Sequence, residues 1–496
     1  MIDILTSAAA IAASGLSMLR WVRVAQREHY LPGSVVRFAV RWWGSRIVNL
    51  AGFVLAVAGA IVSIWVRPVG LVTAAIIAFG PLGLGVRGRT APLAWTPRLR
   101  RTVGAAAALL FLLLAVGGAG VVAVMVAPAI PLLVDAALWL LWPVEVRSST
   151  RFVDEASRRL ASVAPTVVAI TGSFGKTTTK AHVGRLLRNR RRVVVSPASF
   201  NNRLGLARSI NEQLTPGTEV FVAEMGTYGR GEIRALCEWI RPTVSVITAI
   251  GPVHLERFGT LEAVASAKAE IVDGSQTLVL NIDHPQLAEL ADAEEGRREV
   301  IRCSSSSARA DVYVGPDSMV YLRGQAIGAT SDGEAFPGNV ACAVGVLAAI
   351  GLTADPADLA SLERPAHRRQ VATAQSGAVV IDDTYNANPV GARAALSMLG
   401  RYASPGARRV VVTPGLVELG RRQFAENVAL AEHAAREATD IVIVGRTNRR
   451  ALLEGSRGAM SVRVVDSREE AVAWVRRTLG PGDAVVYEND LPDHYP

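Results

Sequence analysis

Long runs of apolar residues dominate the first third of the chain. Residues 47–66 contain no charged side chain over twenty positions, which is enough for a helix to cross a hydrocarbon layer of about 30 Å. The other candidates are residues 103–127, the shorter runs 2–19 and 68–86, and the run 129–142, which contains Asp135. Buried helices of a soluble core are the alternative, but such cores rarely need about eighteen uncharged apolar residues in a row. We therefore expect residues 1–146 to form a transmembrane helical region of four to five spans.

Tryptophans and arginines indicate how these helices lie in a membrane. Seven of the nine tryptophans lie in the first third, near the ends of the runs, as in an interfacial belt. Six arginines lie in 20–46 and five in 87–101, whereas the connection 67–70 holds only Arg67. The positive-inside rule then places the N-terminus outside and both basic loops in the cytosol, and five spans leave everything after residue 146 in the cytosol. We expect a multi-pass protein of the cell membrane whose catalytic domains are cytoplasmic.

The pattern changes after the apolar region. Residues 147–164 read as an amphipathic connector, because Phe152, Ala156 and Leu160 recur at helical spacing. Short β-branched runs then alternate with helical stretches, which is typical of parallel sheets. The first series of expected strands is 166–170, 191–197, 218–226, 244–251 and 277–283, and the second is 378–383, 408–415, 440–445, 461–466 and 484–490. The fold class is therefore α/β, with doubly wound domains at 165–360 and 361–496 and a ligand in the cleft between them.

The stretch "TGSFGKTTTK", residues 171–180, carries the Gly-Lys-Thr of a phosphate-binding loop. Its spacing is shorter than the usual G-x-x-x-x-G-K-[ST], because the nearest glycine before Gly175 is Gly172. The loop follows an expected strand and opens an expected helix, so its backbone amides can hold the phosphates of ATP. The predicted nucleotide-binding residues here are Gly172, Ser173, Gly175, Lys176, Thr177 and Thr178, with Thr177 on Mg²⁺.

Two further residues follow neighbouring strands at the edge where a nucleotide would lie. Glu224 ends the strand in "VFVAEMG", and His254 lies just past the next strand in "IGPVHLERFG". We expect both to reach metal beside the phosphates, although a lone histidine is more often structural. A motor or transporter ATPase is the competing interpretation, but an apolar strand ending in Asp-Glu, which such enzymes use, is missing from this region.

Lysine is rare in this chain. Of the 53 basic residues three are lysine, namely Lys176, Lys180 and Lys268. An amine can lose its proton and react at nitrogen, whereas a guanidinium cannot, so Lys268 in "ASAKAEI" is a candidate reactive residue. For Lys180 a cation on the helix surface is the favoured interpretation. The three cysteines form no CxxC pair, so we expect reduced thiols and no zinc ribbon.

The blocks "TGSFGKTTTK", "SFNNRLGL", "VAEMG", "IGPVHLERFG", "SAKAEIV", "NIDHP", "HRRQV" and "IDDTYNANP" resemble those of the Mur ligases, in that family's order. These are ATP-dependent amide ligases of peptidoglycan precursor synthesis, and the most similar type adds D-alanyl-D-alanine. The resemblance covers about 165–420 and implies a carboxylate–amine ligase that works through an acyl phosphate and releases ADP and phosphate. It further implies that Lys268 is carbamylated by CO₂ and binds a second Mg²⁺ with His254. The residues implied to hold ATP are Asn281, Asp283, Arg368 and Asp382 or Asp383.

The chain departs from the family pattern in four places. The motifs of the N-terminal domain that grips the UDP-linked substrate have no counterpart, and apolar runs stand in their place. Gly415 replaces an aspartate in "TPGLVELG", and Cys342 replaces an asparagine in "FPGNVACAV". The tail "VVYENDLPDHYP" replaces a Lys-Gly-Ser block, and its carboxylates either face an amine substrate or are solvated. These carboxylates belong to Glu488, Asp490 and Asp493.

Three functions follow as hypotheses. The first is a membrane-anchored ligase that joins an amine-bearing amino acid or peptide to an envelope precursor, which is either a small molecule or lipid-linked. The second is a polyglutamate-type synthetase that extends a chain, and the third is a non-catalytic ATP-binding membrane scaffold. The net charge of +10 and pI near 10.0 suggest nucleic acid, but we expect membrane lipids as the partner because much of the excess flanks the apolar runs.

Overall fold

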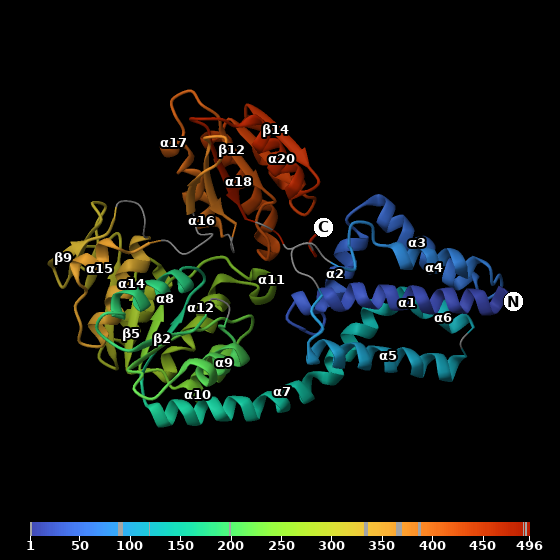
Figure 1. Cartoon of the computed structure of the whole chain (residues 1–496), viewed down its shortest axis with the longest axis horizontal. Helices are drawn as coiled ribbons and strands as arrows, with labels where there is room; N and C mark the ends of the chain where they lie inside the picture. The colour runs from blue at the N-terminus through green and yellow to red at the C-terminus, as the bar shows by residue number, and fades with distance from the viewer. Residues whose placement is uncertain are drawn as a thin grey trace. The chain divides into compact units, whose positions relative to one another are not determined.

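The computed structural model describes residues 2–87, 93–118, 120–197, 200–331, 336–363, 370–384, 388–489, 491 and 494–496. The chain divides into two compact units (Figure 1). The first comprises Met1–Ser148, Gly445–Thr447 and Leu491–Pro496, and the second comprises Ser149–Val444 and Asn448–Asp490.

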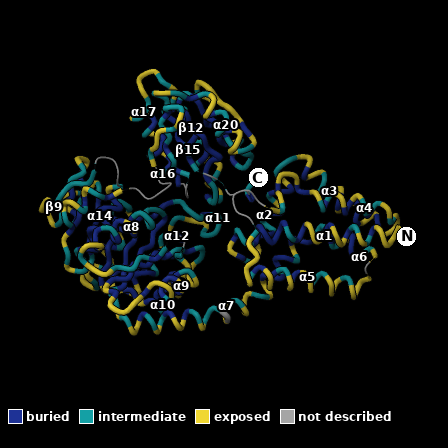
Figure 2. The backbone as a smooth tube through the Cα atoms, in the orientation of Figure 1, coloured by how far each residue is buried: buried dark blue, intermediate teal, exposed yellow. Residues whose placement is uncertain are grey.

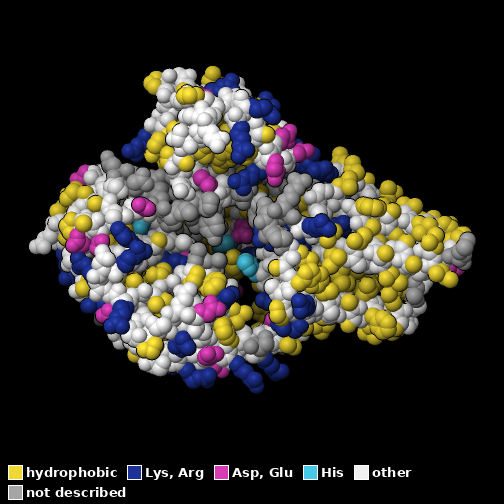
Figure 3. Space-filling model, viewed as in Figure 1, with side chains coloured by type: hydrophobic (Ala, Val, Ile, Leu, Met, Phe, Trp, Pro, Cys, Tyr) yellow, Lys and Arg dark blue, Asp and Glu magenta, His cyan; other side chains and the backbone are white. Residues whose placement is uncertain are grey.

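The first unit is a bundle of apolar helices. They are α1 (Ile2–Arg27), α2 (Ser34–Trp43), α3 (Ile47–Val62), α4 (Val69–Phe79), α5 (Pro97–Gly117), α6 (Val121–Val126), the 3₁₀ turn η1 (Ala127–Ala129) and the first half of α7 (Ile130–Val163). Most of the large hydrophobic side chains exposed in the described residues lie on these helices, for example Ile47, Phe79 and Val116. Figure 3 shows the resulting apolar surface over the helical region. A surface of this kind is expected of a membrane-embedded bundle rather than of a water-facing one.

The helices differ in length from the apolar runs that predicted them. Among the described residues, three helical segments are long and apolar enough to cross a membrane, namely Ile2–Arg27, Pro97–Gly117 and Val121–Val163. The count rises to four if α2 and α3, which meet at 112°, form one span. The run 103–127 is split, because α5 ends at Gly117 and Gly118 has a left-handed φ of 79°. The predicted boundary at residues 146 and 147 falls inside the single helix α7.

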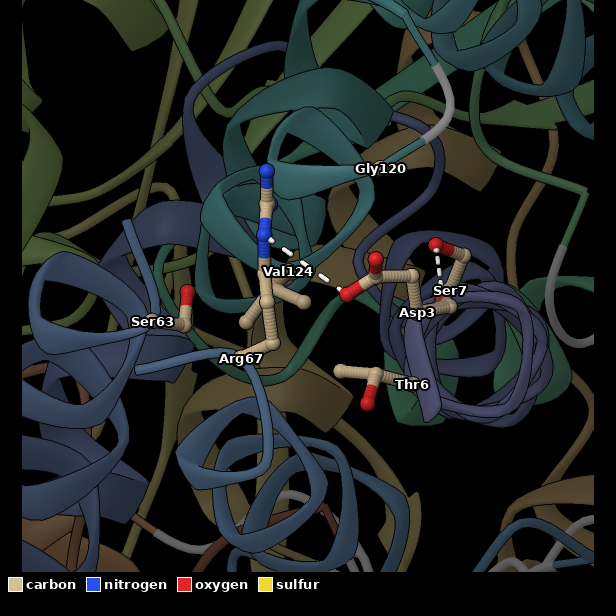
Figure 4. Close-up of a pocket in the computed structure, with 7 residues that line it drawn as sticks. All are labelled: Asp3, Thr6, Ser7, Ser63, Arg67, Gly120 and Val124. Carbon is tan, nitrogen blue, oxygen red and sulfur yellow. Dashed lines mark hydrogen bonds and ion pairs between the residues drawn. The ribbon is translucent and has the colours of Figure 1, made fainter. Parts of the chain in front are cut away.

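One end of this bundle gathers the start of α1, the α3–α4 connection and the start of α6. Arg67 in the connection forms an ion pair of 3.8 Å with Asp3 (Figure 4). The small pocket that they share is lined by Asp3, Thr6, Ser7, Ser63, Arg67, Gly120 and Val124. The hairpin of α3 and α4 therefore extends to the same end of the bundle as the N-terminus.

Two buried charges in the first unit cap helix ends. The Asp135 carboxylate accepts backbone N–H bonds from Gly33 at 2.9 Å and Val36 at 2.8 Å, at the N-terminus of α2. The Arg20 guanidinium donates to the carbonyls of Ala78 and Leu84, both at 2.9 Å, at and beyond the C-terminus of α4. An anion at a helix N-terminus and a cation at a C-terminus both complement the helix dipole. These contacts explain why charged residues occur in such an apolar region.

The last residues of the chain belong to the first unit. His494 is buried and its Nε2 lies 3.0 Å from the Glu28 carboxylate, while the Trp42 indole donates to the His494 carbonyl at 2.7 Å. Tyr495 packs edge-on against Phe38. The described end of the tail is therefore packed, so the alternative of a solvated tail does not hold at His494. Asp490 and Asp493 lie outside the described residues.

The second unit holds two sheets. The first has the order β2-β3-β1-β4-β5-β6-β7-β8-β9 and is parallel from β2 to β7. Its strands are β1 (Thr166–Thr171), β2 (Val193–Val195), β3 (Val220–Glu224), β4 (Val244–Ile247), β5 (Thr277–Asn281), β6 (Glu299–Ser304), β7 (Val312–Val314), β8 (Met319–Leu322) and β9 (Gln325–Ala329). Its central strands are buried (Figure 2), as expected of a parallel sheet covered on both faces.

Two hydrophobic cores cover this sheet. One face packs against α8 (Lys176–Leu187) and α14 (Pro337–Ala349). The other face packs against α9 (Arg203–Gln213), α10 (Glu232–Ile240), α13 (Pro285–Glu294) and the end of α7. Val153, Ala156 and Leu160 of α7 are buried there, so the predicted connector contributes core residues to this unit. The remaining helices around this sheet are α11 (Leu255–Phe258), α12 (Leu261–Ala269), α15 (Pro356–Ala360) and the turn η2 (Val272–Gly274).

The second sheet has the order β10-β11-β15-β12-β13-β14 and is parallel except for β10. Its strands are β10 (Gln370–Thr373), β11 (Val379–Asp383), β12 (Arg409–Thr413), β13 (Asp440–Val444), β14 (Ser461–Val465) and β15 (Ala484–Glu488). The helices of this part are α16 (Pro389–Leu396), α17 (Leu399–Tyr402), α18 (Gln423–Glu437), α19 (Arg449–Gly455), α20 (Arg468–Thr478) and the turns η3 (Gly420–Arg422) and η4 (Ser456–Gly458). All ten predicted strands form, but β6 to β10 were not predicted. Strands β7, β8 and β9 pair in antiparallel fashion and extend the first sheet.

Candidate active site

Two glycines shape the loop between β1 and α8. Gly172 has φ +150° and Gly175 has φ +82°, both disfavoured for residues with a Cβ atom. A Cβ at Gly172 would collide with the Thr248 hydroxyl, and one at Gly175 would collide with the Asn339 side chain. Gly175 precedes the first turn of α8, whose backbone N–H groups have no intrahelical acceptors and favour an anion. The loop therefore has the geometry of a phosphate cradle.

The end of β4 holds this loop in place. Ser173 donates from its backbone to Ala249 at 2.8 Å and from its hydroxyl to the Gly251 carbonyl at 3.1 Å. The Thr248 hydroxyl donates to the Phe174 carbonyl at 2.5 Å. Sequence reasoning found Ser173 but missed Thr248 and Asn339, which lie on other elements and show no local signal. Because its backbone is fixed at several points, the loop is organised before any phosphate binds.

The Lys176 side chain folds back onto the loop that precedes it in the chain. Its ammonium donates to the Gly172 carbonyl at 2.6 Å and contacts the Ser173 carbonyl at 3.4 Å. Thr178 lies beside it in the first turn of α8 and is half-buried. A lysine that bridges the two ends of the cradle is within reach of any phosphate that the loop amides bind.

Glu224 is the centre of a buried polar cluster at the end of β3. The Thr177 hydroxyl donates to its Oε2 at 3.0 Å, and the Asn201 amide donates to its Oε1 at 3.3 Å. Lys180 Nζ lies 2.8 Å from the same Oε2, and Lys180 is only 3 % exposed. The expectation that Lys180 is a cation on the helix surface is therefore wrong, because the side chain turns inward to neutralise a buried carboxylate. Asn201 belongs to the quoted block "SFNNRLGL", but its contact was not predicted.

Lys268 lies near the loop although it is distant in sequence. It is on α12 and is 2 % exposed. Burial, together with the positive charge of Lys176, holds the pKa of the Lys268 ammonium well below its ordinary value. A neutral amine is therefore accessible at this position, as reaction at its nitrogen requires.

His254 is at the start of α11 and has a left-handed φ of 53°. Its Nδ1 contacts the carboxylate of Glu418, which also has a positive φ of 63°, and its ring packs against Tyr228. Within the described residues, no group of three or more His, Cys, Asp or Glu side chains could hold a metal ion. Of the predicted metal set, the structure brings Thr177 and Glu224 into direct contact.

Asn281 ends β5 and Asp283 follows it, and both make several contacts within the protein. The Asn281 amide donates to the Thr248 carbonyl at 2.9 Å and its oxygen accepts from the Asp283 backbone at 3.2 Å. Asp283 accepts bonds from Ser304, Ser305 and Ser306. Burial alone would raise the pKa of Asp283, but these bonds outweigh it and lower the pKa. Their predicted contact with ATP stays a prediction, while the structure shows that they fix the loop after β5.

The predicted ATP contacts from the second sheet are partly described. Arg368 lies outside the described residues. Asp382 accepts two bonds from Thr384, and Asp383 is buried and paired in register with Glu488 on the neighbouring strand β15. Asp383 and Glu488 therefore end adjacent parallel strands at the carboxyl edge of the sheet.

The two residues that depart from the family blocks have clear local explanations. Gly415 has φ +78°, and a Cβ there would collide with the Asn427 side chain. Asn427 is itself bonded to both the N–H and the C=O of Leu416. Cys342 is fully buried within α14 beneath the first sheet, so it serves the core rather than the loop.

Comparison with known proteins shows the family. Residues 170–341 match the Mur ligase middle domain, and residues 367–487 match the Mur ligase, glutamate ligase domain. A UDP-N-acetylmuramoyl-tripeptide–D-alanyl-D-alanine ligase of Mycobacterium leprae is 34 % identical over 366 residues, covering 65 % of this chain and 70 % of that protein. The chain belongs to the Mur ligase family. It is an ATP-dependent ligase that forms ADP and phosphate, so the hypothesis of a non-catalytic scaffold is not retained.

Solved structures agree with this assignment. The MurF ligase of Thermotoga maritima in complex with ADP has a TM-score of 0.59 at 28 % identity, covering 69 % of this Mur ligase and 80 % of that chain. The bifunctional folylpolyglutamate synthase/dihydrofolate synthase of Yersinia pestis has a TM-score of 0.55 at 19 % identity, covering 72 % and 95 %. The second likeness concerns the fold alone. The two sheets described above are thus the central and C-terminal domains of a Mur ligase.

Proposed function

We propose that this Mur ligase is anchored in the cell membrane by its N-terminal helices and joins an amine-bearing amino acid or peptide to a peptidoglycan precursor. The phosphate cradle beside the Glu224 cluster supports the ligase chemistry. The exposed apolar side chains of α1, α3, α4 and α5 are the single observation that supports the membrane anchor.

Amide formation from a carboxylate needs activation, because the carboxylate is a poor electrophile. A carboxylate oxygen of the acceptor attacks the γ-phosphorus of ATP, the bond from that phosphorus to the β–γ bridging oxygen breaks, and ADP leaves. The amine, after losing a proton, attacks the acyl carbon, and the carbon–oxygen bond to phosphate breaks. In this scheme Lys176 and the amides of residues 172–178 hold and stabilise the charge of the transferring phosphoryl group. Asn281, Asp283, Arg368 and Asp382 or Asp383 are the proposed further contacts to ATP.

The Thr177–Glu224 pair fits Mg²⁺. A hydroxyl and a carboxylate oxygen 3.0 Å apart are hard oxygen donors of the kind that Mg²⁺ prefers, and they lie beside the phosphate cradle. Bound there, Mg²⁺ would supply positive charge to the phosphate oxygens. His254 and a carbamylated Lys268 are the proposed ligands of a second ion. The depressed pKa of Lys268 supports this, because only a neutral amine can attack CO₂ and form a carbamate.

The helical unit supports a cytoplasmic position for the ligase domains. With the N-terminus outside, α1 crosses inward, α5 crosses outward and α7 crosses inward again. The hairpin of α3 and α4 adds either two crossings or none, since α3, at about 1.5 Å per residue, is only about 24 Å long. Either number leaves the chain after residue 148 on the inner side, where ATP is available. Five spans and three spans therefore predict the same orientation, whereas four spans would leave the chain after residue 148 on the outer side.

The substrate proposal rests on the relatives. The Mycobacterium leprae relative is named for a UDP-linked muramoyl tripeptide and D-alanyl-D-alanine, so these are the first candidates. In this chain apolar helices precede the central domain, which favours an acceptor at the bilayer surface. We therefore propose a lipid-linked precursor as the acceptor, with the soluble UDP-linked form as the alternative.

The test uses detergent-purified full-length protein with Mg²⁺ and ATP, and measures phosphate release and the joined product. A UDP-linked muramoyl peptide and a lipid-linked precursor are offered separately with a panel of amino acids and dipeptides. We expect turnover with the lipid-linked acceptor. Turnover with only the soluble acceptor would contradict the lipid-linked part, and turnover with only glutamate chains would favour the polyglutamate-type synthetase. Turnover with none of these would contradict the proposal.

A further inference from the structure

Lys180 is a buried lysine that the proposed chemistry does not use. It lies one turn after Lys176 on α8, and its only described polar contacts are the Glu224 Oε2 at 2.8 Å and the Pro197 carbonyl at 3.5 Å. The side chains of Lys180 and Glu224 are 4 % and 3 % exposed. A buried ion pair of this kind costs desolvation of both charges, so stability alone is a weak reason for it.

The contact between Lys180 and Glu224 lies on a carboxylate that two other side chains also contact. Thr177 and Lys180 both approach Oε2 of Glu224, while Asn201 donates to Oε1. Three donors from two segments therefore fix the rotation of one carboxylate at the end of β3. Without Lys180, the carboxylate would be a buried charge held only by a hydroxyl and an amide, and it would be free to turn away from Thr177.

The rarity of lysine in this chain supports a specific requirement for lysine rather than arginine at position 180. Among the 53 basic residues the chain has three lysines, and all of them lie at or near the phosphate cradle. Lys176 bridges the loop, Lys268 lies close enough for the positive charge of Lys176 to lower its pKa, and Lys180 contacts Glu224. A compact ammonium on a flexible stem suits a single buried oxygen better than a planar guanidinium with five donors.

We propose that Lys180 is a positioning residue for the metal site, a statement that rests on the proposed role of Glu224 as a Mg²⁺ ligand. Lys180 keeps the Glu224 carboxylate directed at Thr177, so that a divalent cation meets a prearranged pair of oxygens. It acts from outside the ligand shell, in the way that hydrogen-bonded partners orient metal-binding carboxylates elsewhere.

The test measures metal binding rather than turnover. Mn²⁺ is titrated into detergent-purified full-length protein with ADP present, and free Mn²⁺ is followed by electron paramagnetic resonance. Lys180→Met should weaken Mn²⁺ binding by about 10- to 100-fold. The ADP affinity without metal should change by less than about threefold, because the described contacts of Lys180 do not include the phosphate loop. Arg185→Met is the matched control: it removes a cation from the same helix, where Arg185 donates to Ser361, and should leave Mn²⁺ affinity unchanged.

A double-mutant cycle separates positioning from general stability. In a Glu224→Gln background, Lys180→Met should have no further effect on Mn²⁺ affinity, because Lys180 acts through Glu224. This double variant removes both charges and provides the measurement if Lys180→Met alone does not fold. Unchanged Mn²⁺ affinity in the single variant, or an equal further loss in the Glu224→Gln background, would overturn the proposal. Absence of Mn²⁺ binding in the wild type would overturn the metal site itself, whereas missing turnover with every acceptor would leave the binding result standing.

Discussion

A lysine amine can lose its proton, whereas an arginine guanidinium cannot, and this difference is decisive for Lys268. The side chain is buried and lies near the charge of Lys176, so two effects disfavour its ammonium form. Neither effect is visible in the stretch "ASAKAEI", which predicted reactivity only because lysine is so rare in this chain. The structure supplies the physical reason for that prediction.

Lys268→Arg tests the proposed carbamate. Arginine keeps the positive charge but cannot form a carbamate, so the second metal site should be lost. We expect ATP turnover to fall by about 100-fold or more. With ¹³C-bicarbonate, the wild type should show a carbamate carbon resonance that the variant lacks. Arg234→Lys, an exchange at an exposed residue, serves as the control. Equal turnover and an unchanged resonance in the Lys268→Arg variant would argue against the carbamate.

His182 on α8 predicts an acid-sensitive stability. It is fully buried, and burial lowers its pKa from 6.5 to about 4. Between these values the unfolded chain binds a proton that the folded chain does not, so stability falls as the pH falls from 6.5 toward 4. His182→Leu should remove this contribution, which amounts to about 1.4 kcal/mol per pH unit in that window. Urea unfolding from about pH 5 to pH 8 measures it. The gap between wild type and variant should be constant above about pH 7 and change below, and a constant gap throughout would contradict the prediction.

At the scale of elements, buried strands were the easiest features to predict. Runs such as "TVVAI" are β-branched and buried on both faces of the sheet, so their pattern is unbroken. The missed strands β8 and β9 are partly exposed and joined by a tight turn at Arg323 and Gly324, which resembles a loop in sequence. The glycine-rich loop was predictable because its signal is local. The Thr177–Glu224 contact joins residues 47 positions apart, and only the sheet topology brings them together.

Contacts between residues far apart in sequence also escape prediction in the helical unit. The partners of Asp135 at the start of α2 lie about a hundred positions earlier in the chain. Asp135→Ala should leave the first N–H groups of α2 without their acceptor and destabilise the helical unit by about 1–2 kcal/mol. Asp135→Asn keeps one acceptor oxygen and should cost less. Thermal unfolding in detergent measures both changes, with Asp154→Ala, an exposed residue of the same helix α7, as the control. A melting temperature equal to that of the wild type would show that the cap contributes nothing.

The molecule combines a catalytic unit typical of a Mur ligase with a helical unit of a different character. The helical unit exposes apolar side chains, and the end of the chain, including His494, packs within it. The first unit therefore depends on both the beginning and the end of the sequence. Under the proposed membrane anchor, the orientation of the helices would fix the side on which the ligase domains work, and that side would decide which precursors they meet.

Cysteine labelling tests this orientation. All three native cysteines are buried, so an introduced cysteine can be labelled against a low background. In intact cells, a membrane-impermeable maleimide should label Asp3→Cys at the start of α1 and Trp65→Cys at the tip of the α3–α4 hairpin. It should label Met460→Cys, which is 86 % exposed in the C-terminal domain, only after the membrane is opened.

Labelling of Met460→Cys in intact cells would place the ligase domains outside, away from ATP. If Asp3→Cys is labelled and Trp65→Cys is not, the α3–α4 hairpin enters the membrane without crossing it, and the ligase domains remain inside because α1, α5 and α7 alone give the same orientation.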